Sequence, residues 1–307
     1  MSDPAAGAWS LPRRIRAWYL AAASRDCRPG RVVPFDLAGE RGVIARTDHG
    51  LSALGARCPH MGASLAQGHV DGGRIVCPLH HLGFDRSGRC SHPSVAPARA
   101  FAVAEHAGAV FVCPTDAEGL KVPGSWVAPD LVWRAGPPHQ LALPWEALVA
   151  NAFDLHHLGA VHRRALVEPP VVDQPDPDHL RLRYAARVTG RGLSDRVIAA
   201  LAGDRVEVTV TSGGPTTTVE ARLGGIRSAL VIGFLPGDGT TTARGTFAVA
   251  PGPALAARIR VARWLYTSFL ARDVAVLAGA AFDPRSGLPE DAVLQQLVAF
   301  LDSRVPA

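Results

Sequence analysis

Four residues of metal-binding types occur as two pairs in the first third of the chain. Cys58 and His60 form the first pair, Cys77 and His80 form the second, and a proline follows each cysteine directly. Two short loops of this kind that face each other would supply two thiolates and two imidazoles. Such a set suits tetrahedral zinc, and it also suits a [2Fe–2S] cluster in which two histidines replace two cysteines on one iron. The pattern predicts a metal site and leaves both alternatives open.

A second group of polar residues interrupts a mostly apolar stretch that we predict to be helical, from about Pro144 to His162. Asn151, Asp154 and His157 recur every three residues, so they would lie along one stripe of the helix. A buried polar stripe costs free energy unless its members have partners. A metal ion with hydrogen-bonded ligands would remove that cost.

His157 and His162 are the metal-binding candidates of this stretch. Because the second histidine is five positions after the first, their side chains would diverge by roughly 140° on a regular α-helix. Both can bind one ion only where the helix ends, bends or bulges between them. Gly159 lies in the gap and permits such a distortion. From these residues alone, an ordinary helix with surface histidines is the alternative.

Short strand-like runs separated by Gly, Pro, Asp and Ser would position the Cys/His loops. Such runs are typical of a small all-β domain. A Pro- and Gly-rich stretch follows, and we predict a linker at residues 116–138. The expected strands of the first part are Arg31–Leu37, Gly42–Thr47, Leu51–Arg57, Arg74–Cys77, Arg99–Val103 and Ala109–Cys113.

The rest of the chain combines longer strands with helices. Many of the strands alternate polar and apolar residues, as in a sheet with one wet face. The pattern predicts an α+β domain in which helices pack on an antiparallel sheet. The expected strands are Leu180–Thr189, Arg205–Thr211, Thr216–Leu223, Ser228–Leu235 and Thr240–Ala250, and the further helices are Ser194–Ala202, Ala254–Phe282 and Glu290–Ser303.

Composition excludes several classes of protein. The net charge of +5 is carried by arginine, with Lys121 as the only lysine, and no basic run interleaves with aromatic residues. We therefore expect no nucleic-acid partner. The start of the chain has no signal-peptide pattern, and no segment has the uncharged length of a membrane span. Five cysteines in 307 residues do not form a disulfide scaffold. We expect a cytoplasmic protein whose cysteines are reduced or metal-bound.

The Cys/His loops belong to a longer motif. The segment Cys58–Gly68, followed by Cys77–His80 and Phe84–Asp85, resembles the Rieske domain of aromatic-ring-hydroxylating oxygenases. The resemblance implies that Cys58, His60, Cys77 and His80 hold a [2Fe–2S] cluster. His81 and Leu82 depart from the usual pattern, and neither stands at a ligand position. Outside that segment, the same pattern is matched by Trp18, Tyr19, Arg46 and Gly88.

The histidine stretch resembles the mononuclear iron motif of the same family. The resemblance implies that His157 and His162 bind Fe(II), that Asp154 connects electron transfer between the two metal sites, and that Asn151 supports the ligands. Two histidines and one carboxylate form the facial triad of non-heme Fe(II) oxygenases.

In this family the carboxylate comes from a C-terminal helix, and Asp273 is the best candidate. It is a lone acid in an apolar helix, where an unpaired charge is disfavoured. The alternative is that Asp273 forms an ion pair with Arg272 or with another arginine at the surface. We interpret Asp283, Glu290 and Asp291 as turn and helix-start residues.

The resemblance implies a division into an N-terminal tail at 1–14, a Rieske domain at 15–115, a linker at 116–138 and a helix-grip-like catalytic domain at 139–307. The implied protein is a terminal oxygenase that hydroxylates, dealkylates or desaturates an apolar, ring-containing substrate with O2. The motif wording is similar to that of steroid-hydroxylating components. The implied assembly is a homotrimer in which Asp154 meets His80 of a neighbouring chain.

The electrons must come from a separate ferredoxin or flavin reductase, because the chain has no dinucleotide-binding fingerprint. Two other functions stay open from the sequence. One is a Rieske-type electron carrier with an accessory domain, for which the second metal site would be superfluous. The other is a zinc-stabilised binding protein.

Overall fold

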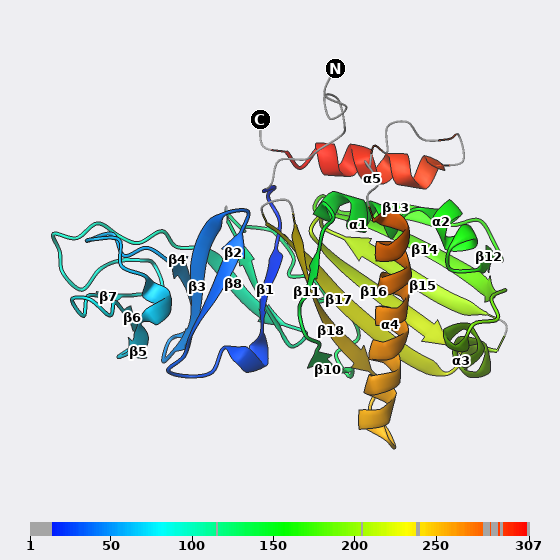
Figure 1. Cartoon of the computed structure of the whole chain (residues 1–307), viewed down its shortest axis with the longest axis horizontal. Helices are drawn as coiled ribbons and strands as arrows, with labels where there is room; N and C mark the ends of the chain where they lie inside the picture. Colours follow the sequence, from blue (N-terminus) through cyan, green and yellow to red (C-terminus); the bar gives the residue numbers. More distant parts are fainter. Residues whose placement is uncertain are drawn as a thin grey trace.

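The computed structural model of the chain describes residues 14–114, 116–203, 205–237, 240–278, 283, 288 and 291–305. The predicted N-terminal tail lies outside these residues except for its last position. The molecule is elongated, with the first part of the chain at one end and a large sheet at the other (Figure 1). Among the described residues, no helix combines the length and the apolar character needed to cross a membrane.

The first part of the chain forms three small antiparallel sheets of three strands each. The strand β9, in the middle of its sheet, is buried throughout, whereas β2 buries Val32, Phe35 and Leu37 and leaves the residues between them more accessible. Short 3-10 helices, η1 (Ser24–Asp26) and η2 (Leu65–Gln67), connect them. The sheets are β1 (Tyr19–Ala23), β9 (Ala109–Cys113) and β8 (Ala102–His106); β2 (Val32–Leu37), β3 (Glu40–Thr47) and β4 (Gly50–Gly55); and β5 (His69–Asp71), β6 (Arg74–Val76) and β7 (Gly83–Phe84).

The second part contains a nine-stranded antiparallel sheet with the order β10-β18-β17-β16-β15-β14-β12, to which β11 and β13 attach. Alternation along each strand places one apolar set, such as Val206, Val208 and Val210, toward the helices. The strands are β10 (Val132–Ala135), β11 (His139–Leu141), β12 (Arg164–Leu166), β13 (Val171–Asp176), β14 (His179–Val188), β15 (Val206–Ser212), β16 (Thr216–Leu223), β17 (Ile226–Pro236) and β18 (Thr241–Val249).

The long helix α4 (Leu255–Leu277) lies across the face of this sheet, and shorter helices cover its end (Figure 1). The sheet curves around α4, so the predicted α+β class with a helix-grip-like second domain is confirmed. The shorter helices are α1 (Trp145–Asn151), α2 (Leu155–Ala160), α3 (Leu193–Ala202) and α5 (Ala292–Asp302).

Two local expectations were wrong. The segment predicted as a linker contains β10, whose Val132 pairs with Val249 of β18, so the large sheet begins before residue 139. A four-residue strand between prolines is too short for its alternation to be visible in the sequence. The single helix expected up to His162 is two helices, α1 and α2, separated by residues 152–154.

A shared core joins the two parts. Buried residues of β1, β2, β14 and β17 belong to one apolar cluster with α1 and α5. Thr216 Oγ1 in β16 donates a hydrogen bond of 2.7 Å to the carbonyl of Trp18, which fixes the chain just before β1. Gly233 of β17 lies so close to β1 that a Cβ there would come within 2.4 Å of Leu20 Cβ. The position of the first part relative to the large sheet is therefore set by close packing.

Candidate metal centres

The two Cys/His loops have the same backbone design. The amide of Gly62 donates to the carbonyl of Cys58 at 2.8 Å, and the amide of His81 donates to the carbonyl of Cys77 at 3.1 Å. Both Gly62 and His81 have a positive φ, at 76° and 56°. This conformation suits glycine and is strained for other residues. His81, which departs from the usual Rieske motif, thus occupies a turn position, and its side chain is exposed.

These loops bring the four predicted cluster ligands together. The Cys58 and Cys77 side chains are buried and face each other, and burial, followed by the neighbouring Cys77 thiol, raises the pKa of Cys58. The imidazoles of His60 and His80 are exposed, with ring centroids 4.8 Å apart. Two buried sulfurs and two exposed imidazoles fit a [2Fe–2S] cluster with its histidine-bound iron toward solvent.

The break between α1 and α2 determines how the second group of side chains is arranged. Asp154 is the N-cap of α2, and its Oδ1 accepts a hydrogen bond of 2.8 Å from the amide of His157. The expected single helical stripe is therefore wrong: Asn151 ends α1, whereas His157 is in α2. The carboxylate caps backbone rather than the ring nitrogen of His157. Its other oxygen, Oδ2, has no hydrogen bond to the residues that the structure describes.

His157 and His162 nevertheless meet, because α2 ends at Ala160 and the chain turns into β12. Their Nε2 atoms are 3.2 Å apart. Asp273, from the C-terminal half of α4, completes the group: its Oδ1 lies 2.9 Å from His157 Nε2 and 2.6 Å from His162 Nε2. All three side chains are nearly buried, and their candidate ligand atoms lie within 4.8 Å of one another.

The donor set and its charge fit Fe(II). Burial alone would raise the pKa of Asp273. The hydrogen bonds with His157 and His162 lower it by a larger amount, so the folded pKa is below the ordinary value and the carboxylate is charged at neutral pH. Two imidazoles and one carboxylate on one side of an open space form the facial arrangement of non-heme iron sites. Arg272, the predicted alternative partner of Asp273, instead bonds Ser194 Oγ at 2.6 Å.

A buried ion pair supports the loop that carries His162. Arg164 Nη1 lies 2.9 Å from Asp195 Oδ1, and each side chain is only 4% exposed. The same guanidinium donates to the carbonyl of His162 at 2.8 Å. Phe269 of α4 stacks on the His162 ring, with centroids 4.4 Å apart and an interplanar angle of 15°. Backbone and ring of His162 are thus both held in place.

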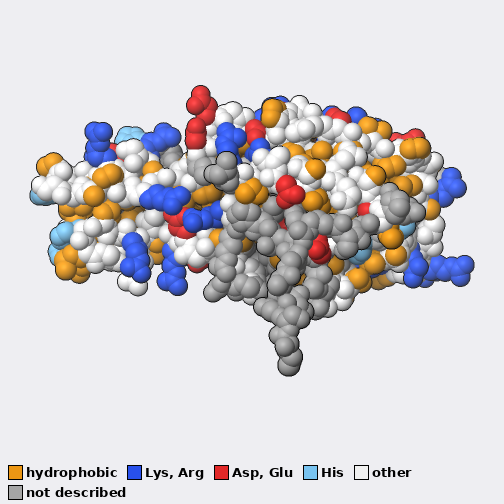
Figure 2. All heavy atoms as spheres, turned by 90° about the horizontal axis from the view of Figure 1, so that it is seen from above, with side chains coloured by type: hydrophobic (Ala, Val, Ile, Leu, Met, Phe, Trp, Pro, Cys, Tyr) orange, Lys and Arg blue, Asp and Glu red, His pale blue; other side chains and the backbone are white. Residues whose placement is uncertain are grey.

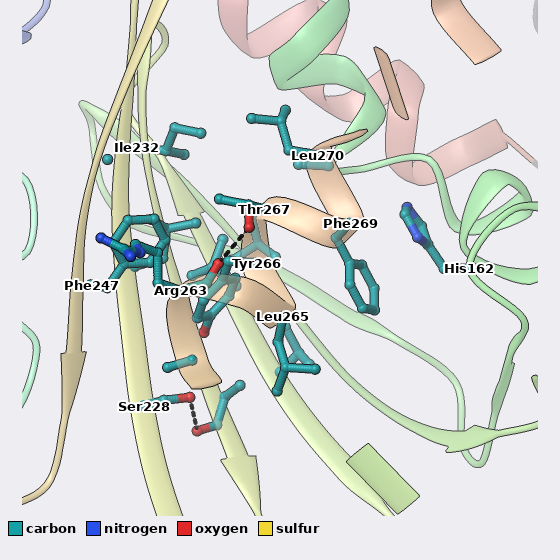
Figure 3. A pocket seen from close by; sticks show the side chains of 18 of the residues that line it. His162, Ser228, Ile232, Phe247, Arg263, Leu265, Tyr266, Thr267, Phe269 and Leu270 are labelled. Atoms are coloured by element: carbon teal, nitrogen blue, oxygen red, sulfur yellow. Dashed lines mark hydrogen bonds between the residues drawn. The ribbon is translucent and has the colours of Figure 1, made fainter. Parts of the chain in front are cut away.

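A cavity of about 670 Å³ opens beside the three side chains, between the sheet and α4. Its wall is largely apolar, and it includes Asn151 and Asp154 as well as the three metal-binding candidates. Figure 3 shows part of this wall, with His162 and Phe269 on one side and Tyr266, Phe247 and Ser228 on the other. This volume is within the range of small-molecule sites.

Sequence reasoning found the candidate ligands but missed the residues that position them. Arg164, Asp195 and Phe269 have no partner at a regular spacing, since their contacts arise between separate elements. The one possible signal was Asp195 itself, an acid near the start of the expected amphipathic helix. An acid in the first turn of a helix is ordinarily exposed, so its burial could not be foreseen from the sequence.

Comparison with known proteins agrees with this geometry. Residues 17–105 match the family of the Rieske [2Fe–2S] domain. The chain is 32% identical over 168 residues to a probable 3-ketosteroid-9-alpha-monooxygenase oxygenase component of Rhodococcus rhodochrous, covering 49% of this chain and 42% of that protein. It is 30% identical over 162 residues to the dicamba O-demethylase oxygenase component of Stenotrophomonas maltophilia, covering 48% and 47%. The chain spans less than half the length of these relatives.

Several solved structures match nearly the whole chain, and two of them illustrate the likeness. Dicamba monooxygenase bound to dicamba has a TM-score of 0.70 at 19% identity, over 96% of this chain and 98% of that chain. Pseudomonas putida CBB5 NdmA with caffeine has a TM-score of 0.74 at 18% identity, over 94% and 90%. Residues 17–105 are thus a Rieske [2Fe–2S] domain, and the chain has the fold of these oxygenases. The resemblance inferred from the motifs is confirmed.

Proposed function

We propose that the chain is the terminal oxygenase of a Rieske non-heme iron system. One observation carries the proposal: His157, His162 and Asp273 converge at the wall of a large apolar cavity, in a protein that also has a Rieske domain. An electron carrier needs no second metal site and no such cavity. A zinc protein would not need two exposed imidazoles at the tip of the first domain.

The residues have separate tasks in this function. Cys58, His60, Cys77 and His80 would hold the cluster, and His157, His162 and Asp273 would hold Fe(II), with Asn151 beside them in the cavity wall. When bound, the cluster and the iron supply electron transfer and O2 activation. The apolar wall binds the substrate and excludes water from the reacting side.

The substrate is a small apolar molecule with rings, and the reaction is a hydroxylation, dealkylation or desaturation. The names of the relatives support this range, since they include a monooxygenase, a demethylase and the Bombyx mori cholesterol 7-desaturase nvd. The size and the apolar lining of the cavity also suit a small apolar substrate.

A ferredoxin or flavin reductase delivers the electrons at the tip of the Rieske domain. There Met61 and Leu79 are 67% and 52% exposed beside the two accessible imidazoles. Figure 2 shows hydrophobic and histidine side chains at this end of the molecule, with arginine side chains behind them. Exposed apolar side chains around an electron-entry group suit a protein partner. We place the protein in the cytoplasm, which agrees with five cysteines that form no disulfide.

Electrons pass between chains rather than within one. The Cys/His loops and α2 lie toward opposite ends of the long axis (Figure 1). Asp154, at the N-terminus of α2, is half-buried. We infer that its Oδ2 accepts a hydrogen bond from His80 of a neighbouring chain. Head-to-tail contacts of this kind close into rings, and the ring proposed here is a homotrimer.

Iron analysis and turnover test the function. The purified protein should contain about three irons per chain, of which two belong to the cluster and one to the mononuclear site. With a surrogate ferredoxin and reductase, a panel of ring compounds should give O2-dependent products. Two irons per chain without product formation would identify an electron carrier, and a colourless zinc-containing protein would overturn both readings.

Asp154→Asn should slow electron transfer from the cluster while leaving the fold intact. Asparagine also caps helices well, so α2 should keep its amide hydrogen bond and the melting temperature should stay unchanged. The loss of charge weakens the contact with His80 of the neighbouring chain. Rapid mixing of reduced enzyme with substrate and O2 should show roughly 10- to 100-fold slower cluster reoxidation.

Asp154→Ser is the matched control for the cap, because serine caps the helix without offering a carboxylate. It should reoxidise as slowly as the asparagine variant. Reoxidation at the wild-type rate in both variants, or full activity of a wild-type monomer, would contradict the proposed route.

A further inference from the structure

The cavity extends along α4 from the metal-binding candidates to a second polar group. Asp273 and Tyr266 are seven residues apart on this helix, so they lie on nearly the same face and about 10 Å apart along its axis. Both line the cavity. Figure 3 shows Tyr266 across the cavity from His162, next to Ser228 and Phe247.

The hydroxyl of Tyr266 is buried and unpaired. Its oxygen has no hydrogen-bond partner among the residues that the structure describes. The neighbouring Ser228 Oγ points elsewhere and donates to the carbonyl of Ala221 at 3.5 Å, the upper limit for a hydrogen bond. Burial raises the pKa of Tyr266 to about 12, and the nearby Ser228 hydroxyl, which does not have hydrogen-bond geometry with Tyr266 in this structure, offsets part of the rise. Tyr266 is therefore a neutral donor without an acceptor, and leaving it so costs free energy.

The surroundings of this hydroxyl are apolar. The wall at this end of the cavity is formed by aliphatic and aromatic side chains of β16, β17, β18 and α4, which include Val219, Ile226, Leu230, Phe247 and Leu265. A ligand that fills this space without an oxygen atom would leave the tyrosine unpaired.

Three arginines, Arg244, Arg258 and Arg263, are among the residues that line this part of the cavity. Arg244 is in β18, and strand alternation places its side chain on the face opposite to Phe247. There burial lowers the pKa of Arg244, and the negative charge of Asp26 in the first domain offsets part of that decrease. Arg258 donates to the carbonyl of Pro251 at 3.5 Å, and Arg263, labelled in Figure 3, is an exposed residue of the cavity wall. Because the Tyr266 hydroxyl is itself neutral, an uncharged acceptor oxygen is sufficient to pair with it.

We propose that Tyr266 donates a hydrogen bond to the carbonyl oxygen of an apolar ring ketone, and that this contact orients the molecule with its opposite end toward His157, His162 and Asp273. The inference rests on the proposed function and names its substrate class. A buried donor discriminates strongly, because an analogue that lacks the acceptor leaves it unsatisfied. Ring hydrocarbons without oxygen should therefore be poor ligands.

Binding of a fluorescent naphthyl ketone tests the proposal without turnover. The probe is 6-propionyl-2-(dimethylamino)naphthalene, whose emission moves to longer wavelength when its carbonyl accepts a hydrogen bond. Tyr266→Phe removes only the hydroxyl. The variant of the full-length holoprotein should bind the probe roughly 3- to 10-fold more weakly than wild type, and bound emission should shift to shorter wavelength.

Two controls make the result specific. The hydrocarbon 2-ethylnaphthalene offers no acceptor, so its own dissociation constant, corrected for the affinity of the probe, should be no lower for wild type than for Tyr266→Phe. Tyr184→Phe removes the hydroxyl of the second tyrosine in the cavity wall, and the bound probe should keep its long-wavelength emission in this variant if Tyr266 is the donor. Equal affinity and identical emission in wild type and Tyr266→Phe would overturn the proposal, as would an emission shift caused by Tyr184→Phe alone. Because neither O2 nor a reductase is used, this outcome is independent of the iron and turnover tests of the oxygenase function.

Discussion

Asp273→Ala should abolish product formation and remove the mononuclear iron, while the visible spectrum of the cluster stays that of wild type. The carboxylate is the only acid that contacts both Nε2 atoms of His157 and His162 among the described residues. Two neutral imidazoles hold Fe(II) poorly, so the loss should exceed the roughly 10- to 100-fold that removal of a supporting residue costs in metal affinity. Iron analysis and the cluster absorbance of the same sample measure both expectations.

Asp283→Ala is the comparison variant, because Asp283 is another acid of the C-terminal part and was expected to be a turn residue rather than a ligand. Glu290 lies outside the described residues. It should keep about three irons per chain and full activity. Retention of the third iron and of turnover in Asp273→Ala would show that Asp273 is not a ligand. Loss of both in Asp283→Ala would instead identify Asp283 as the carboxylate ligand of the iron.

The second large effect is expected on stability. Asp195→Ala leaves the guanidinium of Arg164 buried without its carboxylate, and breaking a buried pair in this way costs about 3–5 kcal/mol of unfolding free energy. Because Arg164 also holds the carbonyl of His162, mononuclear iron binding should weaken as well. Urea denaturation followed by circular dichroism, together with iron analysis, checks both effects.

Asp173→Ala is the matched control, because Asp173 pairs with Arg181 where both side chains are 33% exposed. Its cost should be about 0–1 kcal/mol. If Asp195→Ala and Asp173→Ala lowered the free energy of unfolding equally, burial of the ion pair could not be the cause of the large effect at Asp195.

The effect of Asp195 should also depend on pH. Burial alone would raise the pKa of Asp195. The hydrogen bond and the positive charge of Arg164 together lower it by a larger amount, so the folded pKa lies below the ordinary value. A depressed carboxylate pKa stabilises the folded protein above the unfolded pKa, and this contribution is lost as the pH falls through the folded pKa. The stability difference between wild type and Asp195→Ala should therefore narrow in acid.

Residues with regular spacing made the fold predictable. Alternation identified the strands of the large sheet, and β16 spans Thr216–Leu223 as expected. The paired Cys/His loops and the two histidines proposed to bind iron were visible because each pair is close together in the sequence. Asp273 required the family resemblance as well, since α4 carries it 116 residues beyond His157.

Other features were not predictable, for physical reasons. The break before α2 depends on Asp154 as a cap, a position that aspartate prefers to a helix interior. The apolar pattern nevertheless continues on both sides of Asp154, so it does not show where the helix is interrupted. The pairing of Arg164 with Asp195 joins a strand to a helix, and the unpaired hydroxyl of Tyr266 is known only once its surroundings are packed. Interactions between distant elements leave no local periodicity.

The close packing of Leu20 against Gly233 has a consequence for how this protein can diversify. β1 is paired with β9 of the Rieske domain while it also lies on β17 of the large sheet. A recombination event that exchanged the electron-entry module alone would bring in a foreign β1, and any strand that sits even slightly closer would collide with β17. The two parts must therefore be inherited together, and a new substrate range would arise by point substitutions in the cavity rather than by shuffling domains.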